Sequence, residues 1–134
     1  MMLKNAILAG LLAAGILTMA ALAQEGHPLA GTWHGDWGPS ATQRTPVVIL
    51  MKWETRVLTG VLNPGPNGVA LKVATLEPAK WAVHLEADMK DAKGAVTPVV
   101  IDGTLGDDIG SYNRSLSGTW TQGGTKGTFK LRRD

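Results

Sequence analysis

The segment WAVHLEAD, residues 81–88, decides the fold class because apolar and polar side chains alternate along it. The first set consists of Trp81, Val83, Leu85 and Ala87, and the second of Ala82, His84, Glu86 and Asp88. A period of two places successive side chains on opposite faces of a β-strand. After residue 23 the chain has no sustained apolar period of about 3.6 residues, which would indicate a helix. We therefore predict an all-β protein in which Val83 and Leu85 face the core.

Outward from this segment, the same alternation predicts further short strands separated by Gly, Pro, Asn and Asp. The eight predicted strands cover about residues 31–37, 46–53, 57–63, 69–77, 81–88, 95–105, 115–121 and 125–133. The strongest break is Asn63-Pro64-Gly65-Pro66-Asn67-Gly68, because proline removes a backbone donor and glycine permits a positive φ. The connections are too short for crossover helices, so neighbouring strands should be antiparallel. These features favour an eight-stranded antiparallel up-and-down barrel, with an open β-sandwich as the alternative.

A short phrase with a central glycine recurs in the predicted strands. It reads Leu-Ala-Gly-Thr-Trp at residues 29–33, Leu-Thr-Gly-Val at 58–61 and Leu-Ser-Gly-Thr-Trp at 116–120. Glycine weakens a strand unless it allows a bend or a close approach. We therefore expect Gly31, Gly60 and Gly118 to mark points where strands bend around a barrel.

These phrases resemble two groups of proteins. The Gly-x-Trp at residues 31–33 is similar to the opening strand of the calycins, the group of eight-stranded barrels that includes lipocalins and avidins. In lipocalins this tryptophan packs against a basic side chain of the last strand, so the resemblance implies that role for Lys130, Arg132 or Arg133. The three phrases together also resemble small exported bacterial domains of unassigned function, some alone and some attached to hydrolases. That resemblance implies the fold and an exported setting, and it implies no catalytic residue.

The first 23 residues have the composition of a secretory signal peptide. Lys4 supplies a positive charge, residues 6–22 are apolar, and Ala21-Leu22-Ala23 is a small-x-small cleavage site. The apolar stretch is shorter than the roughly 20 residues of a membrane-spanning helix. We therefore predict cleavage, export to the periplasm or the cell exterior, and no membrane attachment afterwards. The predicted division is a signal peptide at 1–23, a flexible N-terminal segment at 24–30 and a single β-barrel domain at 31–134.

The composition narrows the possible functions. The chain contains no cysteine, which excludes disulfides, thiol catalysis, cysteine metal sites and a lipoprotein anchor. Its formal net charge is +2, and this value falls by one when Lys4 leaves with the leader. A surface that is nearly neutral overall does not indicate nucleic acid or an anionic membrane as a partner.

Two groups of polar side chains share a strand face. His84, Glu86 and Asp88 lie on one face of the predicted strand at 81–88, and an imidazole with two carboxylates is a conceivable metal-ligand set. Because the opposite face is apolar, we interpret them as the solvent face and expect no metal site. His34 and Asp36 share a face of the first predicted strand, and they are weak candidates for a hydrogen-bonded pair near a ligand site.

The five tryptophans, against one Tyr and one Phe, are the strongest indication of function. Trp33 and Trp120 lie in the glycine phrases and should be core residues. Trp37 and Trp53 flank the loop at residues 38–45, so we expect them to line a mouth that binds an apolar ligand. No acid, base and nucleophile form a catalytic motif, and we expect no cofactor. The sequence predicts an exported, non-enzymatic domain that binds a small apolar molecule or an exported partner protein.

A protease inhibitor is the alternative function. Calycin-like inhibitors insert a flexible N-terminal segment into their target, and Gln24-Glu25-Gly26-His27-Pro28 resembles such a segment. The interior of the barrel distinguishes the two hypotheses. A cavity would favour a small ligand, whereas a filled interior would leave function to the loops and the N-terminal segment.

Overall fold

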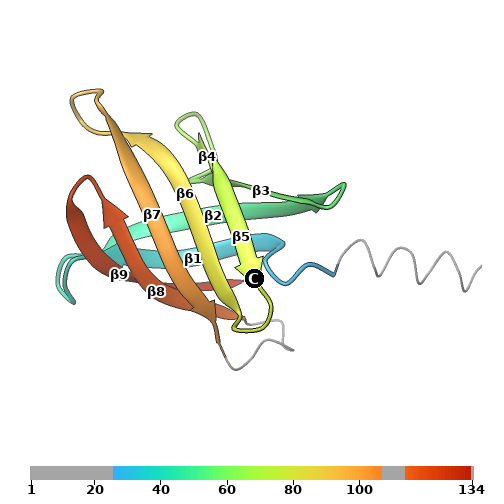
Figure 1. Ribbon diagram of the computed structural model, residues 1–134. Helices are drawn as coiled ribbons and strands as arrows, with labels where there is room; N and C mark the ends of the chain where they lie inside the picture. The colour runs from blue at the N-terminus through green and yellow to red at the C-terminus, as the bar shows by residue number, and fades with distance from the viewer. Residues whose placement is uncertain (1–25, 107–113, 134) are drawn as a thin grey trace, which may run out of the picture.

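The computed structural model describes residues 26–106 and 114–133, which form nine β-strands and no helix (Figure 1). The strands are β1 (Gly31–Gly38), β2 (Thr45–Glu54), β3 (Val57–Leu62), β4 (Val69–Ala70), β5 (Val73–Glu77), β6 (Ala82–Lys90), β7 (Val96–Leu105), β8 (Ser115–Gln122) and β9 (Thr125–Arg133). They make one sheet in the order β4-β3-β2-β1-β9-β8-β7-β6-β5, and all its pairs are antiparallel. The all-β prediction is confirmed, and the described strands form one sheet rather than the two sheets of a sandwich.

The described part has nine strands rather than the predicted eight because the chain changes partner at Leu71 and Lys72. Within the predicted strand at residues 69–77, β4 pairs with β3 and β5 pairs with β6. The backbone N–H of Leu71 donates to the Gly60 carbonyl (2.9 Å), and that of Lys72 donates to the Glu86 carbonyl (2.8 Å). β4 and β5 are therefore the two ends of the sheet, and no ladder among the described strands joins them to close a barrel.

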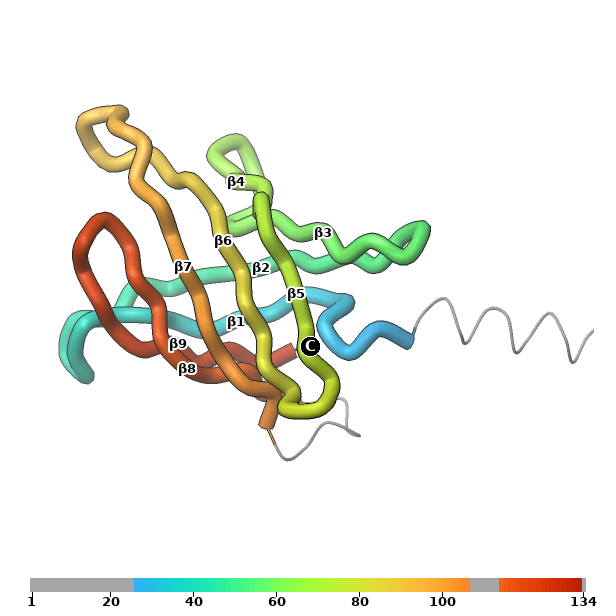
Figure 2. Tube along the Cα trace, in the orientation of Figure 1, coloured from blue at the N-terminus to red at the C-terminus, as the bar shows by residue number. Residues whose placement is uncertain are grey.

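The core lies between the two halves of the curved sheet. Figures 1 and 2 show β5, β6 and β7 crossing in front of β1, β2 and β3. Val83, Leu85 and Ala87 are 2%, 0% and 0% exposed, so the predicted facing of residues 81–88 is confirmed. The indoles of Trp33 and Trp120 are also buried in this core, as predicted. Large apolar side chains thus occupy the interior, so a ligand site has to lie at the loops or strand ends rather than in a central cavity.

The repeated glycines lie where neighbouring segments approach closely. A Cβ at Gly60 would lie 2.6 Å from Cδ1 of Leu71. A Cβ at Gly118 would collide with the backbone carbonyl oxygen of Asp102 on the neighbouring strand β7. At these two positions the missing side chain makes room for a neighbour.

The N-terminal segment, predicted to be flexible over residues 24–30, packs against the sheet in its described part, residues 26–30. Leu29 is 0% exposed and belongs to the core. Its carbonyl oxygen accepts a 2.9 Å hydrogen bond from Nε1 of Trp33. Sequence periodicity did not identify this contact because one apolar residue outside a strand forms no pattern.

Side chains from the far end of the sequence hold the same segment. Arg114 Nη1 donates to the Pro28 carbonyl (2.9 Å), and Arg133 Nη1 donates to the Ala30 carbonyl (3.2 Å). Arg133 is also the register partner of Trp33 between β9 and β1. Insertion of this segment into a protease, as the inhibitor hypothesis requires, would have to break these contacts.

The predicted signal peptide at residues 1–23 lies outside the described residues. Within the described ranges, no helix has the length and apolar character needed to cross a membrane.

Candidate functional site

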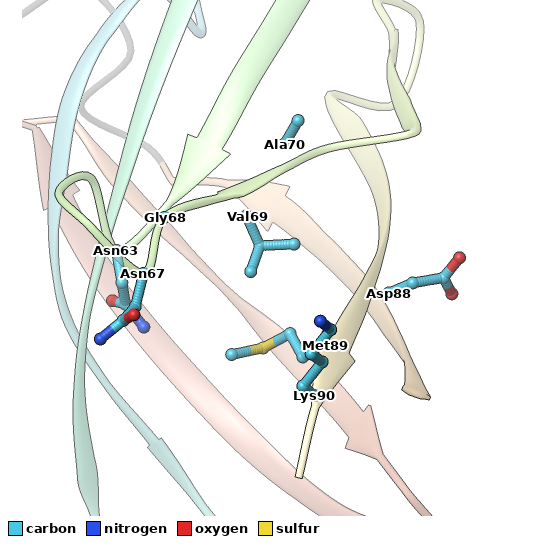
Figure 3. Close-up of a pocket in the computed structure, with 8 residues that line it drawn as sticks. All are labelled: Asn63, Asn67, Gly68, Val69, Ala70, Asp88, Met89 and Lys90. Carbon is cyan, nitrogen blue, oxygen red and sulfur yellow. The ribbon is translucent and has the colours of Figure 1, made fainter. Parts of the chain in front are cut away.

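A cleft of about 770 Å³ lies between β4 and the last residues of β6 (Figure 3). The ladder between β5 and β6 begins at the pair Val73–Glu86, so residues 87–90 of β6 pair only with β7. β4 pairs only with β3. The partner change at residues 71–72 therefore separates the two strands, and we call the opening the β4–β6 cleft.

The loop at residues 63–68 forms one side of the β4–β6 cleft. Asn63 has a φ of +49°, and its backbone N–H donates to the Val48 carbonyl (2.7 Å). Its side-chain Oδ1 accepts a hydrogen bond from the Val48 N–H (3.1 Å). A further bond from the Gly68 N–H to the Gly65 carbonyl (3.0 Å) closes the turn. The predicted strong break thus has a defined conformation that places two asparagine amides beside the cleft.

The β4–β6 cleft combines apolar and polar groups. Val69 and Met89 are partly buried and pack against the core, and Figure 3 shows their side chains extending toward each other across the opening. The Asp88 side chain points away from them (Figure 3) and forms a salt bridge with Lys72 (3.1 Å). Lys90 completes the polar lining together with the amides of the loop. Such an arrangement suits a ligand with an apolar body and a polar group.

A second cluster lies on the outer face of β6 and β7. His84 Nδ1 is 2.5 Å from Asp102 Oδ1, and His84 Nε2 is 2.8 Å from Glu86 Oε2. These hydrogen bonds, first to Asp102 and then to Glu86, raise the pKa of His84 against a smaller opposing effect of burial. An imidazole engaged at both nitrogens by carboxylates has no free nitrogen to act as a general base.

The same cluster differs from the metal-ligand set considered from sequence. His84 and Glu86 are joined by Asp102, whereas Asp88 binds Lys72 instead. No group of three or more His, Asp or Glu side chains in the described ranges is placed to hold a metal ion. The cluster therefore forms an outward-facing hydrogen-bonded link between β6 and β7.

Trp37 and Trp53 lie at opposite ends of the pair formed by β1 and β2. Trp37 pairs with Thr45 at the start of β2, and Trp53 lies near the end of that strand. The eight residue steps between Thr45 and Trp53 correspond to about 26 Å at roughly 3.3 Å per residue. We expected from sequence that the two tryptophans would line one mouth, but this separation places them at different ends of the strand pair. The expectation overlooked that β2 carries the chain along the full length of its pair with β1.

Each of the two tryptophans has an aromatic partner. The Trp37 ring stacks on Trp120, with centroids 5.2 Å apart and an interplanar angle of 13°. Trp37 is therefore an extension of the core. The Trp53 ring lies 4.5 Å from that of His27 in the packed N-terminal segment. Burial lowers the pKa of His27, whose Nδ1 accepts a hydrogen bond from the Leu29 N–H (3.1 Å).

His34 and Asp36 share the outer face of β1, and Arg44 binds the Asp36 carboxylate. Asp36 Oδ1 accepts a hydrogen bond from Arg44 Nε (2.9 Å) and lies 2.8 Å from Arg44 Nη2. His34 is exposed, and its register partners are Val48 on β2 and Arg132 on β9. Asp36 thus holds the loop between β1 and β2 through Arg44. In the sheet order, β2 and β3 separate β1 from β4, so His34 and Asp36 do not border the β4–β6 cleft.

No protein-family model, curated protein or solved structure matches this chain. The candidate site therefore depends on the geometry alone. Sequence analysis did not identify Val69 and Met89 as site residues, although the break at residues 63–68 was the available signal for an irregular region beside them.

Proposed function

We propose that this chain is an exported, non-enzymatic binding domain that takes a small, largely apolar molecule into the β4–β6 cleft. The observation that carries this proposal is the pair Val69 and Met89, which brings apolar surface of the core to an opening bordered by polar groups. The volume of about 770 Å³ lies in the range of roughly 300–1,000 Å³ that small-molecule sites occupy.

We further infer that the sheet acts as a calycin-like barrel in which β4 and β5 are one bent strand. Two observations support this inference. The first and last strands pair with each other, and the hydrogen bonds of Leu71 and Lys72 link the bend to β3 and β6 in turn. In this arrangement the β4–β6 cleft is an opening in the barrel wall.

Binding rather than catalysis is supported by the groups around the cleft. Its lining contains amides, one ammonium group and one carboxylate, and the carboxylate is already paired with Lys72. The histidine with two carboxylate partners, His84, has both ring nitrogens engaged. The polar groups of the cleft can orient and solvate a ligand. Neither they nor His84 supply an acid, a base and a nucleophile at one point.

The test is binding of anilinonaphthalene sulfonate, a fluorescent probe with an apolar body and one anionic sulfonate, to the chain from residue 24 onward. Asn67→Trp should obstruct the cleft from an exposed loop position, and Met89→Asp should place a charge on its apolar side. Both variants should weaken probe binding at least tenfold. Val57→Asp is the matched control, because Val57 is 55% exposed and lies at the opposite end of β3 from Val61 and Leu62, which pair with β4.

The folded state of each variant is checked by its urea midpoint. Unchanged probe affinity in folded Asn67→Trp and Met89→Asp would refute the cleft as the binding site. An equal loss in Val57→Asp would mean that the probe reports the general surface, which would also contradict the proposal.

A further inference from the structure

Charge is segregated on the outer face of the sheet although the chain is nearly neutral overall. Along β9 the buried residues alternate with outward-facing exposed ones. The exposed residues that alternate with the buried ones are Lys126, Thr128, Lys130 and Arg132. On β6 and β7 the outward charged side chains include three acids, Glu86, Asp88 and Asp102. One strand of the sheet thus presents only cations among its outward charges, and the nearest outward acids are Asp36 on β1 and Asp102 on β7.

The cations of β9 are not neutralised by their neighbours. Lys126, Lys130 and Arg132 form no ion pair with any residue in the part of the chain that the structure describes. The acid opposite Lys130 in the register is Asp36, and it is already engaged by Arg44. Three outward charges of one sign on the same strand therefore remain available to an external anion.

The Arg44 side chain lies beside Thr128, which stands between Lys126 and Lys130 on β9. Its Nη1 donates to the Thr128 hydroxyl (3.2 Å) and its Nη2 donates to the Thr128 carbonyl (3.1 Å). The guanidinium therefore lies beside the one outward residue of β9 between Lys126 and Arg132 that carries no charge. The pairing of Arg44 with Asp36 leaves Lys126, Lys130 and Arg132 as the unpaired cations among the described residues of β9, of which they span roughly 20 Å at about 3.3 Å per residue.

A row of hydroxyl groups runs beside the cations on the next strand. Ser117, Thr119 and Thr121 of β8 share the outer face, and their register partners are Lys130, Thr128 and Lys126. Neighbouring strands are about 4.8 Å apart, so one ligand chain can contact both rows. Figure 1 shows β8 and β9 side by side. We call the outward residues of these two strands the basic track.

We propose that the basic track binds an extended acidic polysaccharide, whose sulfate or carboxylate groups contact the cations of β9 while its oxygens bond to the hydroxyls of β8. Charged oxygen anions accept short hydrogen bonds from Lys and Arg, and Ser and Thr both donate to and accept from sugar hydroxyls. The row of cations along one strand suits a linear ligand with repeated charges.

Other polyanions fit the basic track less well. Single-stranded nucleic acid is bound through aromatic side chains on which bases stack, and the outward positions of β8 and β9 carry none. Attachment to an anionic membrane commonly combines basic residues with large apolar side chains that enter the lipid, and these positions carry none of those either. The basic track is also separate from the β4–β6 cleft, so this proposal does not depend on the proposed function.

The test measures binding of heparin by isothermal titration calorimetry at low salt. The variant Lys126→Ala/Lys130→Ala/Arg132→Ala should lose at least tenfold in affinity, and wild-type affinity should fall as salt increases, because ionic contacts are screened. The control variant Lys52→Ala/Lys80→Ala/Lys93→Ala removes the same charge from exposed positions elsewhere and should stay within twofold of the wild type. All six side chains are exposed, so both variants should fold, and their urea midpoints verify this.

Several outcomes would overturn the proposal. These are unchanged heparin affinity in the β9 variant, an equal loss in the control variant, and equally tight binding of desulfated, carboxyl-reduced heparin. Tighter binding of an oligothymidylate or of vesicles containing anionic phospholipid would replace the polysaccharide by nucleic acid or membrane.

Discussion

Replacing Leu29 with alanine tests whether the N-terminal segment is part of the folded domain. Leu29 is 0% exposed and packs in the core. Truncating a buried leucine to alanine costs about 2–5 kcal/mol. The bond from Trp33 Nε1 goes to the backbone carbonyl, so it should survive the substitution and the loss should come from packing alone. With a urea m-value of about 2 kcal/mol/M, a loss of about 3 kcal/mol lowers the unfolding midpoint by about 1.5 M.

The assay is urea unfolding followed by tryptophan fluorescence on the chain from residue 24 onward. Val57→Ala is the matched control, because it removes an apolar side chain that is 55% exposed and should change stability by less than about 0.5 kcal/mol. A midpoint for Leu29→Ala that equals that of Val57→Ala would refute the packed segment and restore the flexible one.

Leu85→Ala should destabilise the protein by about 2–5 kcal/mol and Glu86→Ala by about 1 kcal/mol or less, because only Leu85 faces the core; equal urea midpoints would contradict the register. Trp33→Ala should cost about 3–5 kcal/mol, and Trp37→Ala should cost less but more than about 1 kcal/mol, because the Trp37 ring is stacked yet only partly buried. A free energy of unfolding of Trp37→Ala equal to that of the wild type would show that the Trp37 ring is not packed. The raised pKa of His84 gives stability that is fully present below its ordinary pKa of about 6.5 and is lost as pH rises through the raised pKa. The free energy of unfolding of the wild type minus that of His84→Gln should therefore decrease as pH rises above about 6.5, and a difference that does not change with pH would mean that the two carboxylates do not act on His84.

The strand faces could be predicted from sequence because they depend on local alternation. Val83 and Leu85 face the core since each is flanked by polar or small neighbours, and the same logic separates the buried and exposed residues of β9. The antiparallel order also follows from the short connections. Periodicity does not record where one strand exchanges its partner, so the division at Leu71 and Lys72 was not predicted.

The candidate site could be predicted only in part for the same reason. The break at residues 63–68 was recognised, but its proximity to Met89 depends on the pairing of distant strands. Trp37 and Trp53 were grouped because they flank one loop in sequence, whereas β2 carries them to opposite ends. Net charge likewise sums over the whole chain, so it conceals the row of cations on β9.

The close contact at Gly118 affects how far this sequence can diverge while keeping its fold. A side chain at Gly118 would meet a backbone carbonyl oxygen of Asp102, which is fixed by its own strand, whereas one at Gly60 would meet the movable end of the Leu71 side chain. Over evolutionary time Gly60 can therefore be exchanged together with residue 71, but Gly118 has no such compensating partner. Distant descendants of the same ancestor should retain a glycine at this crossing even after their tryptophans and loops have changed, which makes it a better marker of common descent than the Gly-x-Trp phrase.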